Sequence, residues 1–159
     1  MILLIADTSP LISLLLIGQF ETLESLFPSI CLPQAVWEEL NSHNEIRMYK
    51  NELNRLSLKV RTVRYHFPIS GIERGETEAI ILCQELGADY LLIDDKKARE
   101  KAELLDIKSI GTLGVLFLGK QRGLISALRP LFQTLLNRKR YYAKKYINIF
   151  LEKSGEEAL

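Results

Sequence analysis

The chain has 159 residues, of which 47% are hydrophobic and 26% are charged, and its formal net charge at pH 7 is +1. These values are ordinary for one soluble globular domain that is large enough to bury a core. The small net charge neither favours nor excludes a polyanionic partner, so any basic surface must be local.

The apolar N-terminus does not have the form of a signal peptide. It lacks a basic segment, and Asp7, Ser9 and Pro10 interrupt it before it reaches membrane-spanning length. Cys31 and Cys83 lie in apolar stretches without the spacing of metal ligands, which predicts reduced core residues. We therefore expect a cytoplasmic protein.

The first predicted elements are short and mostly apolar. Residues 2–6 predict a strand, and residues 10–18 a helix that begins on a proline and ends near a glycine. Residues 20–27 predict a second helix, residues 29–32 a strand, and residues 33–42 a helix with proline at its first position.

The middle of the chain continues this alternation. Residues 44–58 are polar and predict a helix, and residues 58–63 alternate like a strand with one wetter face. Residues 75–87 predict a helix closed by a glycine, residues 89–94 a buried strand, and residues 95–105 an exposed helix.

A last short strand at 107–110 and a helix at 111–123 complete the pattern. Strands that alternate with helices indicate an α/β fold: a three-layer α/β/α sandwich around a mostly parallel central sheet of four to five strands.

The tail from residue 124 to 159 has no strand signal and predicts helices. It carries basic residues among three tyrosines: Arg138, Lys139, Arg140, Tyr141, Tyr142, Lys144, Lys145 and Tyr146. Such a mixture suits contact with phosphates and stacked bases. The alternative is an amphipathic helix with a solvated basic face.

Asp7 follows the first predicted strand directly, within the stretch IADTSPLI. An aspartate is costly near a dry interior unless something pairs with it. It could cap the next helix, since Asp, Thr and Ser are common capping residues, or it could be a functional carboxylate.

Asp94 ends the buried strand DYLLID, and Asp95 follows it. The carboxyl ends of parallel strands line the ligand crevice of an open sheet, so Asp7 and Asp94 are expected on the same rim. Capping of the helix at 95–105 is the alternative for Asp94 and Asp95, but it does not explain why two strands end alike.

The helices add further carboxylates. Glu39 flanks the buried stripe of its helix, whereas Glu38 is expected in solvent. Glu76 falls within the apolar arc of its helix and Glu78 at the edge of that arc. Glu76 could also simply favour the helix N-terminus through the helix dipole.

Carboxylates gathered at one edge repel each other unless a cation neutralises them, and Mg²⁺ or Mn²⁺ suits such oxygen ligands. Competing sites are absent from the sequence: His43 and His66 are expected on the surface, and GTLGVL lacks the lysine of a phosphate-binding loop.

Five motifs in this order resemble those of the PIN-domain family, closest to a VapC-like prokaryotic branch. The motifs span residues 2 to 126 and are IADTSPLI, LPQAVWEEL, GETEAI, LLIDDKKARE and IGTLGVLFLGKQRGLI. The resemblance implies a PIN-like catalytic domain at 1–126 and a C-terminal helical extension at 127–159 that packs on the same domain.

The resemblance also implies the site. Asp7, Glu39, Glu76 and Asp94 would bind the metal, with Glu78 possible in place of Glu76, and Asp95 would be a substitute or helper for Asp94. Asp95 or Glu78 could accept the proton. Thr8 or Ser9 would lie beside the metal, as the hydroxyl after the first aspartate does in the family. The residues expected to contact nucleic acid are Thr8, Ser9 and Lys96 together with Arg138, Lys139, Arg140, Lys144 and Lys145, the last five from the basic and aromatic composition of the tail.

By this resemblance the chain is expected to be a Mg²⁺- or Mn²⁺-dependent ribonuclease that hydrolyses RNA phosphodiester bonds. It would be the toxin of a toxin–antitoxin pair, a homodimer inhibited by a small antitoxin protein. Two of the four acidic positions are glutamate here, which keeps open a PIN-fold protein that binds RNA or a partner without cutting. A haloacid-dehalogenase-like phosphatase is disfavoured because Ser9 stands where that chemistry needs an aspartate.

Overall fold

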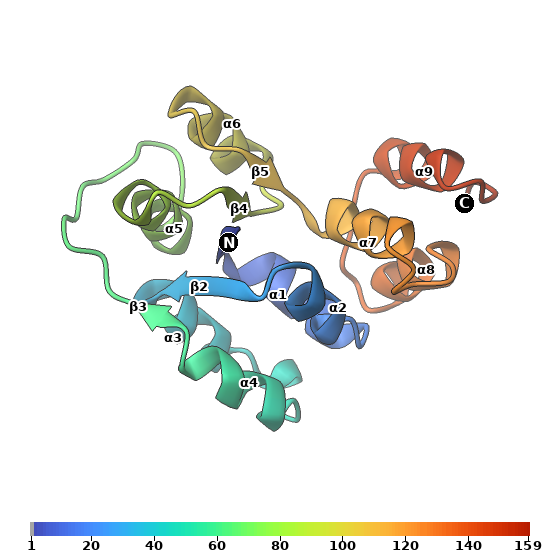
Figure 1. Ribbon diagram of the computed structural model, residues 1–159, viewed down its shortest axis with the longest axis horizontal. Helices are drawn as coiled ribbons and strands as arrows, with labels where there is room; N and C mark the ends of the chain where they lie inside the picture. Colours follow the sequence, from blue (N-terminus) through green and yellow to red (C-terminus); the bar gives the residue numbers. More distant parts are fainter. Residues whose placement is uncertain (1) are drawn as a thin grey trace.

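A computed structural model describes residues 2–159 as a twisted sheet with helices on both faces (Figure 1). The strands are β1 (Leu3–Ala6), β2 (Ser29–Pro33), β3 (Val60–Arg61), β4 (Tyr90–Leu92) and β5 (Ser109–Ile110). They are arranged in the order β3-β2-β1-β4-β5, and all four pairings are parallel. The predicted fold class is therefore confirmed.

The helices follow the predicted pattern, with differences at their ends. They are α1 (Thr8–Leu16), α2 (Phe20–Leu26), α3 (Gln34–Ser42), the 3-10 helix η1 (Asn44–Ile46), α4 (Lys50–Ser57), α5 (Arg74–Leu86), α6 (Lys96–Leu104), α7 (Thr112–Gln121), α8 (Arg129–Asn137) and α9 (Lys144–Lys153). None of the helices between residues 2 and 159 is long and apolar enough to cross a membrane.

Several predicted elements were wrong in detail. β4 spans Tyr90–Leu92 rather than 89–94, so Asp94 lies beyond the strand instead of ending it, and β5 spans Ser109–Ile110 rather than 107–110. α1 begins at Thr8 rather than at Pro10, because Asp7 already takes the extended N-cap conformation. The polar segment 44–58 is broken into η1 and α4. β3 has two residues rather than six, because only Val60 and Arg61 pair with β2 at the edge of the sheet.

Side chains of alternate strand residues enter two hydrophobic cores, one on each face of the sheet. Leu4 and Ala6 of β1 and Leu92 of β4 belong to the core formed with α1, α2 and α7. Ile5 and Leu91 face the second core, which α5 and α6 complete.

The C-terminal segment belongs to the first core. Phe132 and Leu135 of α8 and Ile147 and Leu151 of α9 are buried there, and Figure 1 shows both helices beside α7. The division of the chain into 1–126 and 127–159 stays a prediction.

Candidate metal centre

The strand order reverses at β1, which has β2 on one side and β4 on the other. Asp7 follows β1, and Asp94 lies two residues beyond β4. The backbone N–H of Asp7 donates to the carbonyl oxygen of Leu92 at 2.9 Å, which ties the two strand ends together. Such a switch point is where open α/β sheets bind ligands, and here it carries two aspartates.

Asp7 is 5% exposed and is not a side-chain cap. Asp7 precedes α1, but its carboxylate makes no capping hydrogen bond to any of the described residues Thr8–Leu16 of that helix. Burial raises the pKa of Asp7 to about 7, the backbone amide of Thr8 opposes the rise, and the charges of Glu76, Glu39 and Asp94 add to it. Asp7 is thus a buried carboxylate whose ionised form is disfavoured by burial and by the charges of three other carboxylates.

Glu39 reaches the same edge from α3, the helix that follows β2. Its Oε2 accepts a hydrogen bond from Thr8 Oγ1 at 2.7 Å, so the first residue of α1 orients it. Its carboxylate lies against Gly75 at the start of α5, where a Cβ would clash with Glu39 Oε1. The missing side chain at Gly75 therefore makes room for Glu39.

Glu76 lies at the third position of α5 and forms a reciprocal capping box with Glu73. Its Oε1 accepts from the Glu73 backbone N–H at 3.0 Å, which is the helix-terminus role that the sequence left open. Burial raises the pKa of Glu76, the Glu73 amide opposes the rise, and the charges of Asp95, Glu73 and Glu39 add to it. The capping role does not remove Glu76 from the acidic edge.

Glu78 has a different environment from the one the helix periodicity predicts. It is only 4% exposed rather than at the edge of the apolar arc. Its Oε1 accepts from the Ala35 backbone N–H at 3.1 Å, and its Oε2 accepts from Arg74 Nε at 3.2 Å. Glu78 thus joins α5 to the start of α3, and both of its carboxylate oxygens have hydrogen-bond donors there.

Asp94 and Asp95 divide the two roles that the sequence allowed. Asp95 is the exposed N-cap of α6, and its Oδ2 accepts from the Ala98 N–H at 3.0 Å. Asp94 instead faces Thr112, whose backbone N–H and hydroxyl donate to it at 2.8 and 2.6 Å.

Tyr142 is the residue that sequence reasoning missed. Its hydroxyl lies 2.9 Å from Asp94 Oδ2 and 2.8 Å from Ser13 Oγ. Burial raises the pKa of this hydroxyl, and the charge of Asp94 adds to the rise, so it stays protonated and donates. Its only sequence signal is its place among the basic and aromatic residues of the tail.

The residues expected to contact nucleic acid lie in different environments. Thr8 is buried against Glu39, and Ser9 Oγ accepts from Arg140 Nη2 at 2.7 Å. Lys96, at the start of α6, is exposed. Four further basic residues of the predicted contact set, all in the tail, are exposed: Arg138, Lys139, Lys144 and Lys145.

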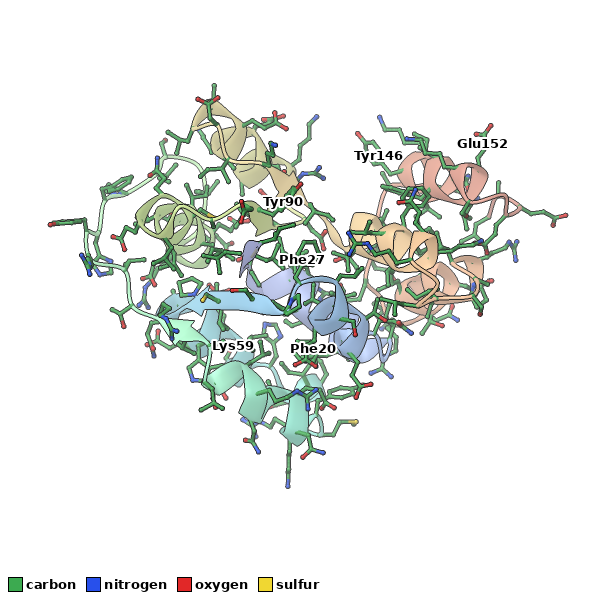
Figure 2. The ribbon with its side chains drawn as sticks, in the orientation of Figure 1. Phe20, Phe27, Lys59, Tyr90, Tyr146 and Glu152 are labelled. Atoms are coloured by element: carbon green, nitrogen blue, oxygen red, sulfur yellow. The ribbon has the colours of Figure 1, made fainter. Side chains whose placement is uncertain are left out.

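Two tyrosines accompany these exposed cations. Tyr141 is 75% exposed and Tyr146 is 48% exposed. Figure 2 shows Tyr146 on the outer side of α9, and the ammonium of Lys145 lies 4.9 Å from the centre of its ring.

The donor set at the acidic edge suits a hard divalent cation, because its potential ligands are carboxylate oxygens. Asp7 is buried, has a raised pKa and lies near three carboxylates, so a cation there would relieve their repulsion. Within residues 2–159, no three Asp, Glu, His or Cys side chains stand close enough to form a finished metal site.

Comparisons with known proteins agree with this architecture. A PilT N-terminus domain protein from the hyperthermophilic archaeon Sulfolobus solfataricus P2 superposes with a TM-score of 0.55 at 19% identity. The match covers 72% of this chain and 91% of that one, which supports the fold alone. A search of curated proteins gives no significant match. A sequence model of the DUF3368 family, described as a PIN domain, matches residues 3–156. The chain belongs to this family of PIN domains.

Proposed function

We propose that the protein is a metal-dependent endoribonuclease whose acidic site consists of Asp7, Glu39, Glu76 and Asp94. PIN domains are generally nucleases and generally use divalent metal ions. The observation that carries the proposal is the gathering of these carboxylates around buried Asp7, whose pKa all three others raise.

Each residue has a defined part in this proposal. Asp7 and Asp94, at the ends of adjacent strands, would hold one or two Mg²⁺ or Mn²⁺ ions together with Glu39 and Glu76. When bound, such an ion lowers the pKa of a coordinated water and stabilises the negative charge that develops on the phosphate. Thr8 and Thr112 orient Glu39 and Asp94 through hydrogen bonds of 2.7 and 2.6 Å.

Asp95 is the better candidate for accepting the proton from the attacking water. It is exposed, it is close enough to Glu76 to raise the pKa of that residue, and its capping bond occupies Oδ2 alone. Glu78 is less suitable because one of its oxygens binds Ala35 and the other binds Arg74.

The substrate we propose is single-stranded or loop RNA, with the exposed basic and aromatic residues of the tail as its contact surface. The PIN resemblance further suggests a cytoplasmic toxin, a homodimer whose site a small antitoxin protein would block.

The test is cleavage of a labelled structured RNA in Mn²⁺, Mg²⁺ or EDTA. Wild type should cut only with metal, and Asp7→Asn and Asp94→Asn should each lower the rate at least a hundredfold. Asp106→Asn is the matched control, because Asp106 is exposed at the opposite end of the sheet and its φ of 58° suits asparagine. Equal cutting by all four proteins would contradict the proposal.

A second candidate is a PIN-fold protein that binds RNA without cutting it. It is favoured by the spacing of the carboxylates, no three of which among residues 2–159 form a finished metal site. In the same assay this candidate predicts retarded RNA, no products with either metal, and no effect of Asp7→Asn on binding.

A further inference from the structure

Residues 138–143 join α8 to α9, and we call them the connector; two of them, Arg140 and Tyr142, contact α1. Arg140 Nη2 donates to the carbonyl oxygen of Ser9 at 3.0 Å and to Ser9 Oγ at 2.7 Å. Arg140 Nε donates to Ser13 Oγ at 3.0 Å. The connector is thus fixed to the helix that begins directly after Asp7.

Ser13 is the inner link of this contact. It is fully buried in α1, among leucine and isoleucine residues, and a buried hydroxyl requires a partner. Its Oγ lies 2.8 Å from the hydroxyl of Tyr142, which in turn lies 2.9 Å from Asp94 Oδ2. Four residues therefore form one continuous chain from Arg140 to Asp94.

The chemistry of its two ends fixes the direction of the chain. A guanidinium only donates and an ionised carboxylate only accepts. Because Tyr142 has one hydroxyl proton and gives it to Asp94, Ser13 must donate to Tyr142 and accept from Arg140. Each hydrogen bond then polarises the next in the same direction, toward the carboxylate.

The chain also determines which part of Asp94 stays open. A carboxylate has about four acceptor positions. Tyr142 and the hydroxyl of Thr112 occupy two positions on Oδ2, and the backbone N–H of Thr112 occupies one on Oδ1. The remaining position is on Oδ1.

We propose that Arg140, Ser13 and Tyr142 are positioning residues for Asp94, so that the connector is a structural part of the acidic site. The inference rests on the proposed function, in which Asp94 is a metal ligand. It goes beyond that proposal because it assigns a role to a segment outside the four acidic residues and to a buried serine.

The test uses the full-length Tyr142→Phe and Ser13→Ala proteins. Tyr141→Phe is the matched control. It makes the same chemical change as Tyr142→Phe, at a neighbouring tyrosine that is 75% exposed. Three quantities are measured: the dissociation constant for Mn²⁺ by calorimetry, the melting temperature in EDTA, and the ¹³Cγ chemical shift of Asp94 in the metal-free protein at pH 7.5.

We expect Tyr142→Phe to weaken Mn²⁺ binding by about tenfold or more, the usual effect of removing a hydrogen bond to a metal ligand. Ser13→Ala, which does not touch Asp94, should weaken it in the same direction. Both variants should move the Asp94 signal, and Tyr141→Phe should change neither quantity.

The inference is overturned if both variants bind Mn²⁺ within twofold of wild type and leave the Asp94 signal in place, even if they melt earlier. If wild type itself binds no Mn²⁺, the proposed metal site is wrong. The Asp94 signal of the metal-free Ser13→Ala protein still decides whether Ser13 acts on Asp94. A changed ¹³Cγ shift of Asp94 supports the hydrogen-bond chain from Arg140 to Asp94, and an unchanged shift refutes it.

Discussion

Burial of Asp7 opposes the stability of the fold at neutral pH. The pKa of this carboxyl rises from 3.8 to about 7, chiefly because it is buried and also because it faces other carboxylates. A carboxyl whose pKa is higher in the folded state binds more protons there than in the unfolded chain. Its cost is therefore absent below pH 4 and grows as the pH rises toward 7.

Asp7→Asn should therefore stabilise the metal-free protein. We expect the free energy of unfolding to rise by about 2 to 4 kcal/mol at pH 8, from a pKa difference of about three units, and to change little at pH 4. Urea unfolding in EDTA at both pH values measures this. Asp106→Asn controls for the chemical change, and a destabilised Asp7→Asn at pH 8 would contradict the account.

Substitution by glutamine should have different effects at Glu76 and at Glu78: the first should lower the affinity for Mn²⁺, and the second should lower the stability of the fold. Glu76→Gln should weaken Mn²⁺ binding by about tenfold or more, because it removes a charged ligand. Glu78→Gln should leave the affinity unchanged and lower the free energy of unfolding by about 1 to 3 kcal/mol, because it weakens a buried bond to Ala35 and a partly buried bond to Arg74.

Calorimetry and urea unfolding of both glutamine variants decide between the two positions. The reverse pattern, with metal affinity lost only in Glu78→Gln, would make Glu78 the third ligand.

For single residues, the sequence could predict the place of side chains that follow a strand, because strand ends are local features of the sequence. Asp7 and Asp94 were found in that way. The contact of Tyr142 with Asp94 joins residues 48 positions apart and has no periodicity, so the sequence alone could not reveal it. Glu78 was placed at the edge of the apolar arc of its helix because periodicity does not report a partner on another helix.

At the scale of elements, long periodic segments were predictable and short irregular ones were not. α5 and α7 lie within one or two residues of their predicted ends, since their apolar stripes and terminal glycines are strong local signals. β3 was overestimated because alternation in 58–63 indicates a strand but does not say how many residues find a pairing partner. Tertiary contacts decide that number.

Glu156 joins three elements at the far end of the chain. It accepts from Lys120 of α7 at 2.7 Å and from the backbone N–H groups of Leu128 and Arg129 at the start of α8. Burial alone would raise its pKa, but these donors lower the pKa of Glu156 to about 2. The side chain thus anchors the end of α9 to the other C-terminal helices.

The contribution of Glu156 to the free energy of unfolding should depend on pH with the opposite sign to that of Asp7. A depressed carboxyl pKa stabilises the fold above about pH 5, and the benefit is lost as the pH falls toward 2. Glu156→Gln should lower the free energy of unfolding by about 1 to 3 kcal/mol at pH 7 and much less at pH 2.5. Glu157→Gln is the exposed control, and an equal loss at both pH values would contradict this role.

At the scale of the whole molecule, the net charge of +1 conceals a separation of charge. Carboxylates gather beyond the ends of β1 and β4, and the tail carries several exposed cations. The connector belongs to both regions, since Arg140 and Tyr142 reach the acidic edge while their neighbours face solvent.

If the tail binds RNA, Lys144→Ala combined with Lys145→Ala should weaken binding and reduce its salt dependence. Loss of two phosphate contacts lowers the slope of log K against log salt by about 1.4 for a single strand. Fluorescence anisotropy at several salt concentrations measures this slope. Lys97→Ala combined with Lys101→Ala is the control on α6, and an unchanged slope in the tail variant would place the RNA elsewhere.

The central claim is that the carboxylates of adjacent strand ends and helices form one metal site. The most direct test is the anomalous scattering of Mn²⁺ in crystals of wild-type protein grown with excess metal. We predict a peak bound by Asp7 and Asp94 together with Glu39 or Glu76, and no such peak in Asp7→Asn crystals. A Mn²⁺ peak at other residues only, or no peak at this edge in the wild type, would contradict the account.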